Sequence, residues 1–164
     1  MKTLLLALHG SVCFAAQAQT TPAAETQALA REINQLMRDP QKPKQELTLT
    51  LAGCHAEQLI RDRGADVQTS QPLAVSFNRG DSGWAMKMDN GVFEMKMSFE
   101  WANVTSLTYE PTTNNKGQKH FNIKLNNQKN GSNTNFSLPL FTTDEAVVKD
   151  VTARLEKVRQ RCQK

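Results

Sequence analysis

The chain has 164 residues, of which 38% are hydrophobic and 22% charged, and its formal net charge is +4. This length fits one globular domain with a single core. Acidic and basic residues alternate along the chain, so the sequence contains no block of like charge of the kind that typically binds nucleic acid. We therefore expect no nucleic-acid partner.

The first 18 residues have the features of a cleavable secretory signal peptide. Lys2 is followed by an apolar run from Thr3 to Ala16, and the tripeptide ending at Ala18 has the Ala-x-Ala pattern of a cleavage site. The run falls short of the roughly 20 residues that span a bilayer. Cleavage after Ala18 would leave 146 residues, with 19 basic against 16 acidic side chains. We expect a periplasmic or secreted protein without an integral membrane segment.

The mature chain is expected to comprise an N-terminal helix with its linker, residues 19–45, and a β-rich domain, residues 46–164. Thr21 and Pro22 are a helix cap and a favoured first helical residue. Leu29, Ile33 and Leu36 then recur at helical spacing, and the linker that follows is short and polar.

Two cysteines, Cys54 and Cys162, stay in the mature chain when Cys13 leaves with the signal peptide. In an oxidising compartment this even number predicts a disulfide, and two free buried thiols are the alternative. Cys54 follows a strand on its polar side, so it either points outward or lies after a bulge at Gly53.

The clearest local pattern is a hairpin around Asn90-Gly91, a pair that favours a type I′ turn. The turn fixes the register, which places Asp89 opposite Val92 and Trp84 opposite Met97. One face of the hairpin then holds Trp, Met and Phe side chains, and the other holds an opposed pair of charges, Lys87 and Glu94.

Alternating apolar residues predict further strands. Their apolar positions span Leu47–Leu51, Leu73–Phe77, Val104–Tyr109, Phe121–Leu125 and Phe136–Leu140, and the alternation of the hairpin continues through Phe99 and Trp101. His55–Arg63 is ambiguous between a strand and a helical turn. Loops are expected at Gly64–Pro72, Pro111–Gln118 and Asn126–Asn135, and Pro139 indicates an edge strand or a bulge.

The chain closes with a predicted amphipathic helix. Thr142 and Glu145 have the spacing of a capping box. Val151, Leu155 and Val158 share one face of the helix with Cys162, which predicts that this face packs on the sheet.

The predicted fold class is α+β, mainly β: a small antiparallel barrel or sandwich of about seven strands, with an N-terminal helix and a C-terminal amphipathic helix packed on it. Short strands followed by a capped helix resemble a pleckstrin-homology-like barrel. From Phe93 to Cys162 the order is similar to GRAM-type members, with a strand entering Val104–Leu107, two short strands, Phe141 and the helix with Ala146. The resemblance implies a binding or scaffolding role. A different β-sandwich with a docked helix is the alternative.

Catalytic motifs are missing from the sequence. The mature chain has two histidines, His55 and His120, and neither belongs to a metal-binding or nucleophile motif. Cys54 would be a candidate nucleophile only if unpaired. We therefore expect no enzyme activity and no cofactor.

Four methionines offer one candidate metal site. Met86 and Met88 face Met95 and Met97 across the hairpin, beside Trp84, and thioethers are soft ligands that select Cu(I). The favoured interpretation is that these side chains fill the core, because methionine packs well against aromatic rings.

The function expected from these features is that of an exported, non-enzymatic periplasmic protein that binds a protein partner or a small apolar ligand. One alternative is a Cu(I) carrier that uses the four methionines. Another is an inhibitor or immunity-type protein that blocks an envelope-active enzyme.

Overall fold

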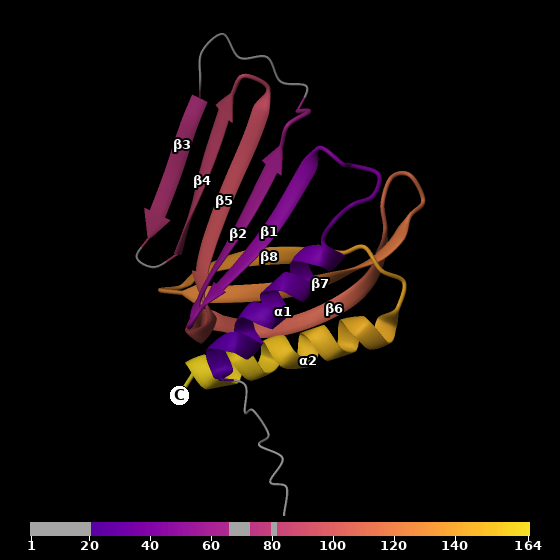
Figure 1. The fold of residues 1–164 in the computed structure, drawn as a ribbon. Helices are drawn as coiled ribbons and strands as arrows, with labels where there is room; N and C mark the ends of the chain where they lie inside the picture. The colour runs from indigo at the N-terminus through magenta and orange to yellow at the C-terminus, as the bar shows by residue number, and fades with distance from the viewer. Residues whose placement is uncertain (1–20, 66–72, 80–81) are drawn as a thin grey trace, which may run out of the picture.

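The computed structural model describes residues 21–65, 73–79 and 82–164, which form two antiparallel sheets and two helices (Figure 1). The predicted signal peptide and most of the expected loop Gly64–Pro72 lie outside the described residues. The elements in chain order are α1 (Pro22–Leu36), β1 (Gln45–Ala52), β2 (His55–Asp62), β3 (Leu73–Arg79), β4 (Ser82–Asp89), β5 (Val92–Glu100), the 3-10 helix η1 (Trp101–Asn103), β6 (Val104–Thr113), β7 (Lys119–Lys129), β8 (Ser132–Leu140) and α2 (Glu145–Cys162).

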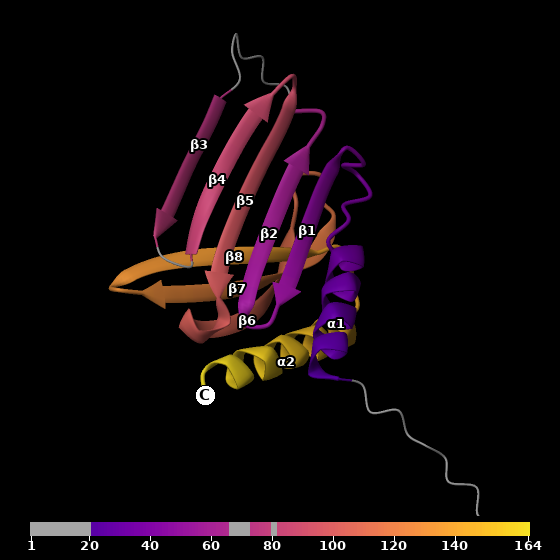
Figure 2. The same cartoon turned by 60° about the vertical axis from the view of Figure 1, so that its left-hand side comes forward.

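The predicted class, mainly β with a helix at each end, is confirmed. Strands β1-β2-β5-β4-β3 form a five-stranded sheet, and β6-β7-β8 form a separate three-stranded sheet. The molecule is therefore a sandwich. The three-stranded sheet crosses behind one end of the five-stranded sheet, and the other end projects beyond it (Figures 1 and 2).

The hairpin predicted at Asn90-Gly91 is confirmed in turn and in register. Both turn residues have positive φ, 49° and 74°, as a type I′ turn requires. Asp89 pairs with Val92 and Trp84 pairs with Met97. Lys87 lies opposite Glu94 as expected, although the carboxylate of Glu94 binds Arg61 of β2 at 2.9 Å.

The ambiguous segment after Cys54 is a strand, β2, which raises the number of strands to eight in the described part of the chain. Its inward positions include Gln58, which interrupts the apolar alternation. The Gln58 side chain is 1% exposed and donates through Nε2 to the carbonyl oxygen of Ser137 in β8 at 3.1 Å. A polar side chain is thus buried because it links the two sheets.

Cys54 is exposed, which agrees with the predicted outward position, but it lies in a turn and not after a bulge. Ala52 pairs with His55, so Gly53 and Cys54 form the two-residue turn between β1 and β2. Gly53 has a φ of 62°, a conformation that glycine adopts without strain. The turn presents Cys54 at the end of the sheet, where α2 finishes.

The three-stranded sheet is longer than predicted. Strand β6 continues through Pro111 to Thr113, because an edge strand tolerates proline. The expected turn Asn126–Asn135 is only two residues, Asn130 and Gly131, both with positive φ, so its flanks belong to β7 and β8. Pro139 lies in β8, which is an edge strand as predicted.

Two boundaries differ from the sequence-based expectation. Strand β5 ends at Glu100, and Trp101 opens a 3-10 turn at the crossing between the sheets. The cap of α2 is Asp144, whose Oδ1 accepts from the amides of Ala146 and Val147, so the capping box at Thr142 is not formed. Thr142 instead accepts from the Asp144 amide at 3.1 Å.

The core lies where both helices and both sheets meet. Helix α1 packs along β1, and α2 runs beside β6 and η1 (Figures 1 and 2). Residues with 2% exposure or less include Leu29, Ile33, Met37, Leu49, Ala56, Phe99, Trp101, Val104, Ile123, Leu125, Leu138, Leu140, Val148, Val151 and Leu155. The predicted burial of the apolar faces of both helices is confirmed.

Candidate functional site

The apolar face of the five-stranded sheet continues beyond the core. Directly paired residues share a face, so this surface is formed by successive rows across the strands. The row through Phe99 is buried, the next contains Met97 and Trp84, the next Met95 and Met86, and the outermost contains Phe93, Met88 and Leu73. Phe99 is fully buried, whereas the residues of the outer rows are partly buried or exposed, because the three-stranded sheet covers only one end of the strands.

A groove of about 530 Å³ lies where this face meets the β7–β8 hairpin. Its first wall comes from the five-stranded sheet and contains Trp84, Met86, Met95 and Met97. Its second wall contains Phe136 and the polar side chains Asn127, Lys129, Ser132 and Thr134. The volume is within the range of small-molecule sites, roughly 300–1,000 Å³.

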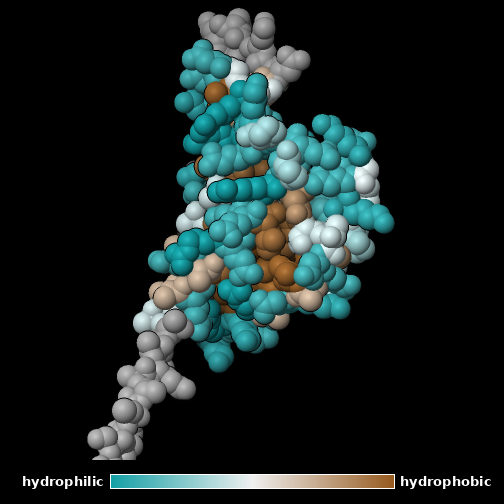
Figure 3. Space-filling view, turned by 45° about the vertical axis from the view of Figure 1, so that its right-hand side comes forward, coloured by the Kyte–Doolittle hydropathy of each residue, from teal (hydrophilic) through white to brown (hydrophobic). Residues whose placement is uncertain are grey.

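The apolar layer between the sheets also reaches the surface on another side. The view from the side of β1 and the β6–β7 loop shows hydrophobic residues gathered in a hollow, surrounded by hydrophilic residues (Figure 3). On β1, α1 and the three-stranded sheet, the core is extended outward by partly buried residues: Leu36, Leu47, Leu107, Tyr109 and Phe121.

The two walls of the groove differ in chemistry. Large apolar side chains form one wall, and Trp84 is 38% exposed there, which is unusual for a side chain of this size. The opposite wall supplies amide, hydroxyl and ammonium groups. This arrangement suits a ligand with an extended apolar surface that is held in orientation by polar groups on one side.

The structure brings three of the four predicted methionines into the groove. Met86 and Met95 are directly opposed, and Met97 lies one row closer to the core. Met88 lies further out, opposite Phe93 and Leu73. Only Met97 packs against the buried core, and even this side chain is only partly buried, so the interpretation of the four residues as core fillers is wrong for the others.

Metal binding by the methionines stays a prediction. In the described part of the chain, no group of three or more His, Cys, Asp or Glu side chains is arranged to hold a metal ion. That finding concerns ligands other than thioethers.

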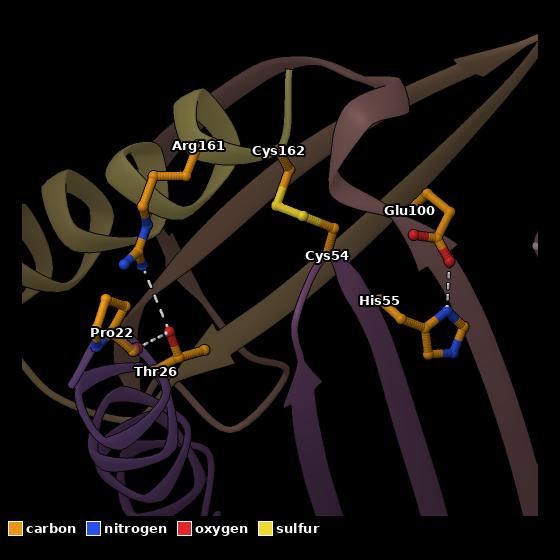
Figure 4. The surroundings of a disulfide bond; sticks show 7 residues. All are labelled: Pro22, Thr26, Cys54, His55, Glu100, Arg161 and Cys162. Atoms are coloured by element: carbon orange, nitrogen blue, oxygen red, sulfur yellow. Dashed lines mark hydrogen bonds and ion pairs between the residues drawn. A yellow bond between two sulfur atoms is a disulfide. The ribbon is translucent and has the colours of Figure 1, made fainter. Parts of the chain in front are cut away.

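The predicted disulfide between Cys54 and Cys162 is present (Figure 4). It joins the β1–β2 turn to the last turn of α2, with a Cα–Cα distance of 5.5 Å. The amide of Trp101 donates to the Cys54 carbonyl oxygen at 2.8 Å, and Arg161 donates to Thr26 Oγ1 of α1 at 3.4 Å. The bridge therefore lies where both sheets and both helices converge.

The two histidines are in separate places. His55 follows Cys54, and its Nδ1 lies 2.6 Å from Oε1 of Glu100, its partner across β2 and β5. His120 is buried and stacks on Phe141, with ring centroids 5.1 Å apart. The structure does not bring them together.

A polar cluster joins the start of α2 to β6. The Tyr109 hydroxyl donates to the Glu145 carboxylate at 3.1 Å, and Lys149 binds the same carboxylate at 3.1 Å. The hydrogen bonds from Lys149 and Tyr109 lower the pKa of Glu145. Desolvation, aided by the hydrogen bond to Glu145, raises the pKa of Tyr109. The cluster therefore anchors the first turn of α2 to strand β6.

The polar wall of the groove was missed by sequence reasoning. The sequence predicts a loop that includes Asn127, Ser132 and Thr134, whereas the type I′ turn at Asn130-Gly131 makes them strand residues. Recognising that turn would have placed Asn127 and Thr134 opposite each other on the face that also carries Phe136. The contact between this wall and the methionine face joins strands that are far apart in the sequence, so no local sequence pattern predicts it.

Comparisons with protein-family models, curated proteins and solved structures gave no match. The resemblance to a pleckstrin-homology-like barrel thus stays a prediction. Neither described helix has the length and hydrophobicity needed to cross a membrane.

Proposed function

We propose that the mature chain is an exported, non-enzymatic binding protein that holds a small apolar ligand in the groove beneath the projecting end of the five-stranded sheet. The observation that supports this proposal is the apolar wall formed outside the buried core by Trp84, Met86, Met95 and Met97. Methionine suits such a wall because its flexible thioether adapts to ligands of different shape.

Export to the periplasm is part of this proposal. The first 18 residues fit a signal peptide cleaved after Ala18, and a disulfide persists in an oxidising compartment. Inhibition of an envelope-active enzyme stays a prediction from the sequence.

Binding of the neutral fluorescent probe N-phenyl-1-naphthylamine tests the proposal. Transfer of the probe into the groove should raise its emission and quench Trp84. The other tryptophan, Trp101, is fully buried and does not line the groove. Met86→Lys should weaken binding about tenfold or more, because a charged side chain in an apolar site costs on the order of 1–3 kcal/mol.

The matched control is Lys87→Met. This residue is adjacent on β4 but lies on the opposite face, so the variant should bind the probe within about twofold of the native protein. Equal affinity of the native protein and Met86→Lys would contradict the proposal.

A second candidate is Cu(I) binding in the same groove. The supporting observation is that Met86 and Met95 oppose each other directly, with Met97 and Trp84 beside them. Competition with bicinchoninate should then show one Cu(I) per chain, lost in the variant Met86→Leu with Met95→Leu. This change nearly preserves side-chain volume, so the fold and probe binding should persist. If the protein binds the probe but no Cu(I), the Cu(I) proposal is wrong and only the proposal of an apolar ligand stands.

A further inference from the structure

The five-stranded sheet ends at β3, whose second edge has no pairing strand among the described residues. This strand, Leu73–Arg79, pairs with β4 on one side only. The backbone amides and carbonyls that point away from β4 are available to another strand.

The other three sheet edges are obstructed. At β1, the Asn34 side chain of α1 binds both the amide and the carbonyl of Leu49. At β6 and β8, Pro111 and Pro139 each remove a backbone donor. Gln58 also occupies the Ser137 carbonyl of β8. Such devices prevent strand pairing between molecules, and the described residues show none at β3.

The side chains of β3 favour pairing as well. Leu73 and Val75 are 46% and 41% exposed and lie opposite Met88 and Met86, on the apolar face of the sheet. Residues 73 to 78 contain no charged side chain. Natural edge strands commonly carry charges that repel a second strand, whereas the charge of β3 is confined to its last residue, Arg79.

We propose that β3 is a dimerisation strand that pairs antiparallel with β3 of a second copy of this chain. The pairing joins two five-stranded sheets into one continuous sheet. The twofold axis of an antiparallel strand pair is perpendicular to the sheet, so the apolar faces of both copies lie on the same side. Leu73 and Val75 of each copy then extend the apolar face of the other.

The shape of the protein favours a second copy over an unrelated strand. The β7–β8 hairpin lies at one end of β4 and β3, while the other end of these strands projects without a second layer (Figures 1 and 2). Antiparallel pairing places the covered end of one copy beside the projecting end of the other. The uncovered rows around Leu73 and Met88 are therefore brought next to the second layer of the partner copy.

Sedimentation velocity of the mature, disulfide-bonded protein over about 1–500 μM tests this proposal. The mass should rise toward twice the monomer value within this range, since weak homodimers have micromolar dissociation constants. Val75→Lys puts a charge on each side of the new interface and should abolish the rise. The matched control is Asn133→Lys, an exposed residue of edge strand β8, which should dimerise like the native protein.

Hydrogen exchange of the native protein gives a second measurement that depends on no variant. Amide protection at residues 73–79 should increase with protein concentration, while protection of the β8 edge should not. A native protein that stays monomeric throughout the range, a dimer unaffected by Val75→Lys, or concentration-dependent protection confined to other strands would each overturn the proposal. Probe binding in the groove is measured separately, so either result leaves the ligand proposal to its own test.

Discussion

The Asn34 side chain in α1 forms a peptide-like pair of hydrogen bonds with the backbone of Leu49 in β1. Its Nδ2 donates to the Leu49 carbonyl oxygen at 3.0 Å, and its Oδ1 accepts from the Leu49 amide at 2.7 Å. An amide side chain thus takes the place of a neighbouring strand. This contact both docks α1 on the sheet and closes the edge of β1.

Asn34→Ala should therefore lower the free energy of unfolding by about 1–3 kcal/mol, because the amide and carbonyl of Leu49 lose their partners in a partly buried site. Urea denaturation measures the change. Asn34→Asp is the matched variant: it keeps the acceptor for the Leu49 amide but loses the donor to the carbonyl oxygen. An unchanged unfolding midpoint in Asn34→Ala would show that α1 docks without this contact.

Loss of the disulfide should cost about 2–5 kcal/mol. The bridge spans 108 residues, and a loop of this size restricts the unfolded chain strongly. The comparison is between native protein and Cys54→Ala with Cys162→Ala in denaturant, with and without reductant. Reductant should destabilise the native protein and leave the double variant unchanged. The intact mass of the native protein should also be two hydrogens below that of the reduced form.

Among the residues of α2, Leu155 is the one whose side chain should destabilise the protein most when it is shortened. Its side chain is fully buried, between Val151 and Val158 on the same face. Leu155→Ala should cost about 2–5 kcal/mol through lost burial and the cavity left behind. Lys157→Ala, two residues further along the helix, is the control and should change stability by only a few tenths of a kcal/mol. Equal effects of the two variants would contradict the docking of α2 through this face.

The parts of the fold that local chemistry determines were predictable from the sequence. The type I′ turn at Asn90-Gly91 sets every pair of the β4–β5 hairpin, and the spacing of Val151, Leu155 and Val158 sets the buried face of α2. Strand β2 could not be assigned because inward Gln58 breaks the apolar alternation. Its burial depends on Ser137, which lies far away in the sequence.

The candidate site was only half predictable for a similar reason. The register of one hairpin places Trp84, Met86, Met95 and Met97 on one face, but it does not reveal whether another layer covers them. Whether a second layer covers these side chains depends on where the three-stranded sheet ends. That sheet reaches Phe99 and leaves the outer rows open, so an expected core face is a groove wall.

The last prediction concerns the pH dependence of stability at Glu156 and Arg159 in α2. The Arg159 side chain binds the Glu156 carboxylate at 2.6 Å, and its Nη1 also donates to the Val104 carbonyl oxygen at 3.2 Å. The hydrogen bond from Arg159, helped by one from Gln160, lowers the pKa of Glu156 below its ordinary value, against partial burial. Both side chains of the pair are at most 30% exposed.

Because the pKa of Glu156 is lower in the folded than in the unfolded protein, its stabilising contribution is present above the unfolded pKa and is lost as the pH falls through the folded pKa. Glu156→Gln should therefore lower the free energy of unfolding by about 0.5–1 kcal/mol at neutral pH. The difference from the native protein should begin to shrink as the pH falls below the ordinary Glu pKa of about 4.3, and should vanish once the pH has passed through the lower pKa of the folded protein. In an Arg159→Gln background the same substitution should lose most of its effect, because the partner is gone. Denaturant titrations between neutral and acidic pH measure both differences, and a gap that stays constant down to acidic pH would show that the charge of Glu156 does not contribute.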